Sequence, residues 1–184
     1  SSNYLDQGQG GFSQSIFMRN ERVDQGLDGY EMFYRNIRIE NNVIRNGHVH
    51  GITVGEVDGL VINANTLIQT VSVKEGGTVS RPGINVSKRA RNVTITKNVT
   101  PRINTGDFDA GGKWTVMAND IVQREVPARA DHYRNVFVNA EASGEVTLRD
   151  LRILPHSRAG REGLGSSLSE FDMTPESLDG YILH

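Results

Sequence analysis

The chain has 184 residues, which is enough for one sizeable domain with its own core. Its net charge of −2 gives no bulk electrostatic reason to bind nucleic acid or an anionic membrane, and no apolar run is long enough to span a bilayer. The lack of cysteine excludes disulfides and thiolate metal sites.

Short runs with apolar residues at every second position follow one another along the chain, separated by asparagine and glycine. This is typical of strands and turns. Four such segments share a frame in which two apolar residues precede an asparagine, at Asn42, Asn65, Asn98 and Asn119. The steps between these asparagines are 23, 33 and 21 residues, a period in the range of stacked solenoid coils. The longer step predicts an inserted loop at about residues 70–83.

A second alignment predicts another strand in each coil. Residues 29–33, 51–55 and 83–87 share a glycine, then an apolar, a polar and another apolar residue. Alternation along these strands points Ile52 and Val54 inward, so the coils stack their apolar side chains into one column. Asparagine at the corner tolerates left-handed backbone and can hydrogen-bond to its counterparts in adjacent coils.

Further along the chain, Val136 and Val138 repeat the frame with Glu141 in the asparagine place, and Val146 to Ile153 repeats its apolar positions. Coils are therefore expected over residues 1–157, and a tail or cap that folds over the last coil over residues 158–184. The chain start has no methionine, signal peptide or capping helix. This predicts a C-terminal fragment of a longer β-helix, with a homo-oligomer or a partner chain that completes the solenoid as one option.

The asparagine frame followed by GITV (51–54) and GINV (83–86) resembles the right-handed parallel β-helix proteins of the pectate-lyase-like superfamily. That superfamily includes pectate and alginate lyases, mannuronan epimerases and phage tailspikes. The resemblance covers roughly residues 13–154. It implies an all-β, right-handed parallel β-helix and a protein that is secreted or lies at a cell or virion surface. The alternative fold is an antiparallel β-sandwich, against which the recurring asparagines argue.

The outward positions of the second set of strands predict a binding face. Glu31, Thr53 and Asn85 would form a ladder there, and by resemblance such a face holds an oligosaccharide. Glycoside hydrolysis needs two carboxylates at a defined separation, and no second carboxylate aligns with Glu31.

The motif NGHVHG carries His48 and His50 at a corner beside a strand. Lyase or epimerase chemistry on uronates needs a base that removes the proton next to the carboxylate, and a cation that neutralises the developing charge. His48 or His50 would be the base, with Arg81, Lys88 or Arg89 as the carboxylate partner. The alternative interpretation is an ordinary surface corner and a solvated charged surface.

The motif GDFDAGG places Asp107 and Asp109 in a loop that resembles a fragment of a calcium site. It lacks the rest of an EF-hand loop and its bidentate glutamate, so an acidic glycine turn is favoured and no cofactor is expected.

Two functions remain open. The first is a carbohydrate-active β-helix that acts on an acidic polysaccharide as a lyase or uronate epimerase. The second is a non-catalytic β-helix module of a tailspike, adhesin or surface protein that binds glycans or assembles. Fold alone does not choose between them.

Overall fold

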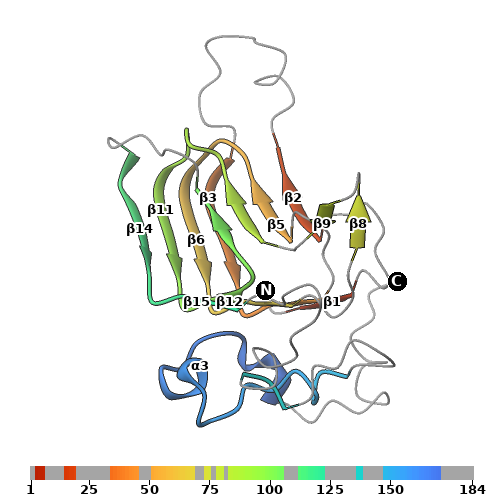
Figure 1. Cartoon of the computed structure of the whole chain (residues 1–184). Coiled ribbons are helices and arrows are strands. Elements are labelled where there is room, and N and C mark those ends of the chain that lie inside the picture. The colour runs from red at the N-terminus through yellow and green to blue at the C-terminus, as the bar shows by residue number, and fades with distance from the viewer. Residues whose placement is uncertain are drawn as a thin grey trace, which may run out of the picture.

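The computed structural model describes residues 3–6, 15–19, 34–45, 51–68, 73–75, 78–80, 83–105, 112–122, 136–138 and 147–170. Their strands form three parallel sheets wound into a right-handed parallel β-helix (Figure 1), which confirms the predicted fold class. Among these residues, no helix is long and apolar enough to cross a membrane.

We call the three sheets A, B and C. Each coil passes first through sheet C, then through sheet A and then through sheet B. Sheet C contains β3 (Tyr34–Glu40), β6 (Val57–Asn63), β11 (Arg91–Thr96) and β14 (Trp114–Met117). Sheet A contains β1 (Tyr4–Asp6), β4 (Val43–Arg45), β7 (Thr66–Ile68), β12 (Val99–Thr100) and β15 (Asp120–Ile121). Sheet B contains β2 (Ile16–Met18), β5 (Ile52–Val54), β10 (Ile84–Val86) and β13 (Ile103–Asn104). Between β7 and β10, in the predicted insertion, β8 (Val73–Glu75) and β9 (Thr78–Ser80) form an antiparallel hairpin.

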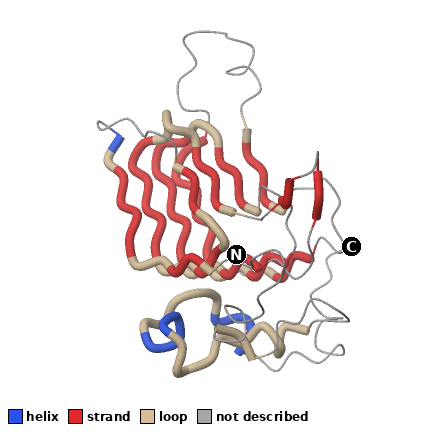
Figure 2. The backbone as a smooth tube through the Cα atoms, viewed as in Figure 1, coloured by secondary structure: helices blue, strands red, loops and turns tan. Residues whose placement is uncertain are grey.

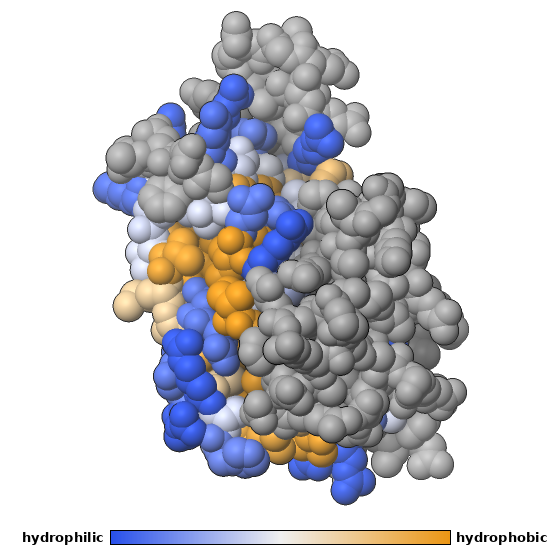
Figure 3. Space-filling model, in the orientation of Figure 1, coloured by the Kyte–Doolittle hydropathy of each residue, from blue (hydrophilic) through white to orange (hydrophobic). Residues whose placement is uncertain are grey.

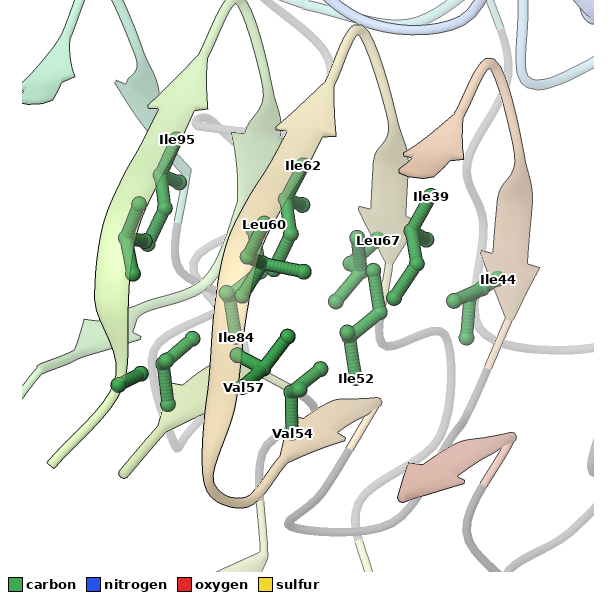
Figure 4. Packing of buried hydrophobic residues seen from close by; sticks show 13 residues of the cluster. Ile39, Ile44, Ile52, Val54, Val57, Leu60, Ile62, Leu67, Ile84 and Ile95 are labelled. Atoms are coloured by element: carbon green, nitrogen blue, oxygen red, sulfur yellow. The ribbon is translucent and has the colours of Figure 1, made fainter. Parts of the chain in front are cut away.

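Every second residue of each strand points inward, and these side chains fill the interior of the β-helix. Ile39, Ile62 and Ile95 occupy the same place in three successive coils of sheet C. Side chains from all three sheets meet in this interior (Figure 4), and most of them are fully buried. The register equals the frame that the sequence predicts, because the period-two pattern of each strand leaves one choice of inner face.

A ladder of asparagines follows the corner between sheets C and A. Each Nδ2 donates to Oδ1 of the next asparagine, at 3.0, 2.8, 2.9 and 2.9 Å for Asn3→Asn42, Asn42→Asn65, Asn65→Asn98 and Asn98→Asn119. The predicted hydrogen-bonded column is therefore confirmed. It also contains Asn3, which the sequence frame did not include.

The left-handed residue at this corner is the one before the ladder asparagine, so the corner does not use the tolerance of the asparagine itself for left-handed backbone. Positive φ angles of 52 to 57° occur at Asn41, Ala64, Lys97 and Ala118. Placing the turn one residue earlier leaves the asparagine side chain buried along the column, where both its oxygen and its amide group are used.

The first strand of sheet B differs from the alignment. The strand that pairs with β5 is β2, with Phe17 opposite Thr53, and not the segment at residues 29–33. Glu31, which the alignment put in the place of Phe17, lies outside the described residues.

The further coils predicted after β15 are wrong where the structure describes them. Phe137 forms an isolated antiparallel bridge with Ile153, and both pack outside sheet A. A further coil would have put Phe137 on the outer face of sheet C, in the column of Thr94 and Thr115. The observed packing instead leaves Phe137 only 1% exposed, which the hydrophobic effect favours.

The described part of the C-terminal segment, up to residue 170, covers the outside of sheet A. It includes α3 (Arg158–Arg161), which begins after the N-cap Ser157, and the 3-10 helix η2 (Ser167–Glu170). Figure 2 shows these helical turns beside the row of strands of sheet A. We call residues 163–167 the strap, because they contact several coils in succession.

The strap binds to three successive coils. The Gly165 N–H donates to the Lys97 carbonyl at 2.7 Å, and the Ser166 N–H donates to Thr66 Oγ1 at 2.9 Å. Ser166 Oγ donates to Asn41 Oδ1 at 2.8 Å. The outside of sheet A is thus an interior surface of the molecule.

The last described coil exposes apolar side chains. Val116, Met117 and Ile121 are 40, 60 and 48% exposed and line a groove of about 480 Å³ at that end. Figure 3 shows hydrophobic surface on the side of the molecule where Figure 1 labels β14.

Candidate functional site

The outer face of sheet B carries one column of side chains between the inward-facing pairs. Phe17, Thr53, Asn85 and Asn104 are in register on β2, β5, β10 and β13. Thr53 and Asn85 are therefore direct neighbours, as the alignment predicts. Phe17 and Asn104 extend the column and were missed, because neither follows the glycine that marks β5 and β10.

This column offers polar groups beside an apolar ring. Phe17 is 45% exposed, whereas Thr53 and Asn85 are half-buried. Thr53 Oγ1 is buried and has no hydrogen-bond partner among the described residues.

Lys88 and Arg89 lie at the corner that follows β10, and both are exposed. The corner is held by Ser87, whose hydroxyl donates to Glu56 Oε1 at 3.0 Å and accepts from the Arg89 N–H at 3.3 Å. Because this corner begins two residues after Asn85, the two cations border the outer face of sheet B.

The next residues of the same corner join adjacent coils. Asn92 Nδ2 on β11 donates to Asp58 Oδ1 on β6 at 2.6 Å, near the beginning of these two strands of sheet C. The carboxylates of Glu56 and Asp58 therefore each accept a hydrogen bond from the following coil. Glu56 and Asp58 lie outside the sheet B column of outward-facing side chains. No described residue in that column is acidic.

The outer face of sheet C has a different electrostatic character. Arg38 Nε lies 2.8 Å from Glu40 Oε2, and this hydrogen bond lowers the pKa of the Glu40 carboxyl and raises the pKa of the Arg38 guanidinium. The opposite charges of Arg38 and Glu40 therefore neutralise each other at the surface. Of the three outer faces, sheet A is covered by the C-terminal segment and sheet C carries this ion pair, which leaves sheet B as the candidate site.

Several residues predicted for the site lie outside the described part of the chain. They are the potential bases His48 and His50, the cation Arg81, the ladder residue Glu31, and the loop carboxylates Asp107 and Asp109. Within the described ranges, no group of three or more histidine, cysteine or acidic side chains could hold a metal ion.

Comparisons with protein-family models, curated proteins and solved structures gave no match. Function must therefore be inferred from the residues of the site.

Proposed function

We propose that this β-helix acts on an acidic polysaccharide, which binds along the outer face of sheet B and the corner that carries Lys88 and Arg89. One observation carries the proposal: within five residues, β10 and its corner place the polar side chain of Asn85 near two exposed cations, Lys88 and Arg89. A face with amide donors and cations suits the hydroxyl and carboxylate groups of a uronate chain.

The proposed chemistry is that of a lyase or a uronate epimerase, as in the pectate-lyase-like superfamily that the sequence resembles. His48 or His50 removes the proton next to the carboxylate, and Arg81, Lys88 or Arg89 neutralises the charge that develops on that carboxylate. In a lyase, the electron pair then forms a double bond while the glycosidic oxygen leaves. In an epimerase, a proton returns from the opposite face. An imidazole suits the base because its pKa lies near neutral pH. Acting on such a polymer, the protein is secreted or displayed at a cell or virion surface.

The test is to incubate the protein with alginate, pectate and glycosaminoglycans, following ultraviolet absorbance for unsaturated uronate ends and NMR for the epimer ratio. Activity should fall at least a hundredfold in His48→Ala or His50→Ala, given the usual contribution of a general base. The variant Lys88→Gln with Arg89→Gln should raise KM. Lys97→Gln, at the corner between sheets C and A, is the matched control and should have no effect. No product with any of these polymers would refute the catalytic proposal.

The second candidate is a glycan-binding module without catalysis, as in a tailspike or adhesin. The exposed ring of Phe17 in the sheet B column favours it, because an aromatic ring offers a flat apolar surface to a sugar without doing chemistry. Binding of a glycan that remains chemically unchanged, and that weakens in Phe17→Ala, would support this candidate.

A further inference from the structure

Inward-facing residues are exposed at the end of the β-helix that β13, β14 and β15 form. These are the last described strands of sheets B, C and A. Val116 and Ile121 are in register with Ile95 and Thr100 of the coil before. Ile95 and Thr100 are fully buried, whereas Val116 and Ile121 are 40 and 48% exposed. The apolar core of the solenoid is therefore open at this end.

The order of the strands shows what would continue the solenoid. The chain passes from β13 in sheet B to β14 in sheet C and β15 in sheet A, so the next strands would pair with β13, then β14, then β15. At the opposite end of the molecule, β2, β3 and β4 follow one another through sheets B, C and A in the same order. Among the described strands, β2 and β3 are outermost in their sheets, and only β1 covers the outer edge of β4.

β1 is bound to β4 through a bond pattern that recurs along the whole ladder. Asn3 Nδ2 donates to Asn42 Oδ1 at 3.0 Å, and the Asn3 carbonyl accepts from the Val43 N–H at 2.8 Å. Asn98 makes the two equivalent bonds to the coil that contains β15, at 2.9 and 2.8 Å. Asn119 stands directly before β15, as Asn3 stands directly before β1. β15 of a second copy can therefore take the place of β1 on β4.

We propose that the end formed by β13, β14 and β15 binds the outer edges of β2, β3 and β4 in a second copy of this chain, with β15 displacing β1. In sheet A, one strand pair replaces another that has the same ladder bond. In sheets B and C, new pairs of β13 with β2 and of β14 with β3 satisfy strand edges. They also bury Val116 beside Ile39 of the second copy, which the hydrophobic effect favours.

The resulting assembly is open-ended. Each copy uses one end as donor and the opposite end as acceptor, so every added copy leaves one end of each kind for the next. The proposal concerns self-association and does not depend on the proposed function.

Sedimentation velocity of the intact protein over a range of concentrations measures the association. Val116→Lys should weaken it at least about a hundredfold, because the joint would bury an unpaired charge. Met117→Gln is the matched control. Met117 is the next residue, is 60% exposed and points to the outer face of sheet C, so this variant should associate like the wild type.

Asn3→Ala tests the displacement of β1. It removes the donor that Asn42 Oδ1 receives from β1, and Asn119 of a second copy would restore that donor. The variant should therefore associate about tenfold more tightly than the wild type, since the lost hydrogen bond is regained only in the assembly. Hydrogen exchange should show that the amides of β1 lose protection on assembly while those of β4 keep it.

Cysteine pairs test the register of the joint. Thr115 extends the sheet C column that begins at Arg38, so Thr115 of one copy should lie opposite Arg38 of the next. The chain has no cysteine, so Thr115→Cys and Arg38→Cys proteins can be mixed and oxidised without competing thiols. A disulfide should join these two variants. Glu40→Cys, two residues out of register, is the control and should not link to Thr115→Cys.

Thermal melts show whether each variant is folded, and where Val116→Lys is not, the cysteine pair decides. A disulfide in the predicted register, together with tighter association of Asn3→Ala, would support the proposal. A monomer at every concentration, in the wild type and in Asn3→Ala, would overturn it. A disulfide between two Thr115→Cys chains, or association that Val116→Lys does not weaken, would also overturn it, because the copies would then meet through other surfaces.

Discussion

Asn98 is fully buried in the middle of the asparagine ladder, and all its polar atoms are used. Its Oδ1 accepts from both the backbone N–H and Nδ2 of Asn65 at 2.9 Å. Its Nδ2 donates to Asn119 Oδ1 and to the Thr96 and Ile62 carbonyls. One side chain therefore joins three coils.

Asn98→Ala should lower the free energy of unfolding by about 2 to 4 kcal/mol, since it leaves buried donors of Asn65 and buried carbonyls without partners. Denaturant unfolding measures this loss. Asn119→Ala is the control, because Asn119 lies at the partly exposed end of the ladder, where water can replace the lost partners. Equal losses in the two variants would show that burial of the ladder has no part in its stability.

Ala64 has a φ of 53° at the corner just before Asn65. A left-handed alanine is strained by its Cβ, and glycine is not, so Ala64→Gly should raise the free energy of unfolding by about 0.5 to 1 kcal/mol despite glycine's greater unfolded entropy. Ala90→Gly is the comparison variant. Its free energy of unfolding should fall, because Ala90 is fully buried and has no positive φ. A loss of stability in both variants would show that the left-handed backbone at Ala64 is not strained.

The strap is the element that holds the C-terminal segment against the coils. A Cβ on Gly165 would stand 2.5 Å from Ile153 Cδ1 and 2.8 Å from Thr66 Oγ1, at a φ of +81°. Gly163 has a φ of +60°, but nothing lies within 4 Å of a Cβ there. The two glycines share the left-handed backbone and differ in the space around them.

Gly165→Ala should therefore cost about 3 kcal/mol, from backbone strain plus overpacking, and Gly163→Ala about 1 kcal/mol from strain alone. Unfolding free energies measure both changes. Hydrogen exchange adds a local readout, because a displaced strap should lose protection at the Gly165 and Ser166 amides that bond to Lys97 and Thr66. Similar costs for the two variants would mean that the strap does not pack closely against sheet A.

The strands of sheet C and the ladder could be predicted from sequence, because each coil repeats both the period-two pattern and the asparagine. The strand β2 could not, since three alternating residues without a glycine resemble many other segments. The C-terminal cover could not either: Ser166 bonds to Asn41 across 125 residues, and no local pattern encodes such a contact.

The same limit applies to the candidate site. Thr53 and Asn85 occupy equivalent places in a repeat, so their alignment follows from counting residues. Phe17 and Asn104 lack the glycine that marks β5 and β10, so their places in the column follow only from the observed strand pairing.

At the scale of the whole molecule, sheet A is buried on both faces from β4 to β12. Its inner face contributes Ile44 and Leu67 to the core of the coils. Its outer side contributes Val43, Ile68, Val99 and Val122 to a second cluster with Phe137, Leu148, Leu151 and Leu164. Strands that are buried on both faces carry continuous apolar runs, as in Val43-Ile44. Sheet A therefore lacks the polar outer face that sheet C has.

Phe137 and Val138 distinguish this arrangement from a simple continuation of the solenoid. In the observed packing Phe137 is 1% exposed and Val138 is 51% exposed. In a further coil the two would exchange roles, with Phe137 on the solvent face of sheet C and Val138 in the column of Ile95 and Val116. Phe137→Ala should therefore cost about 3 to 5 kcal/mol, and Val138→Ala less than about 0.5 kcal/mol.

Denaturant unfolding of the two variants, under the same conditions, gives the comparison directly. A large loss for Val138→Ala with a small one for Phe137→Ala would show that the chain continues as coils beyond β15. The expected result is the reverse, because covering the outer apolar side of sheet A buries a whole phenylalanine ring, whereas a further coil would leave that ring in water.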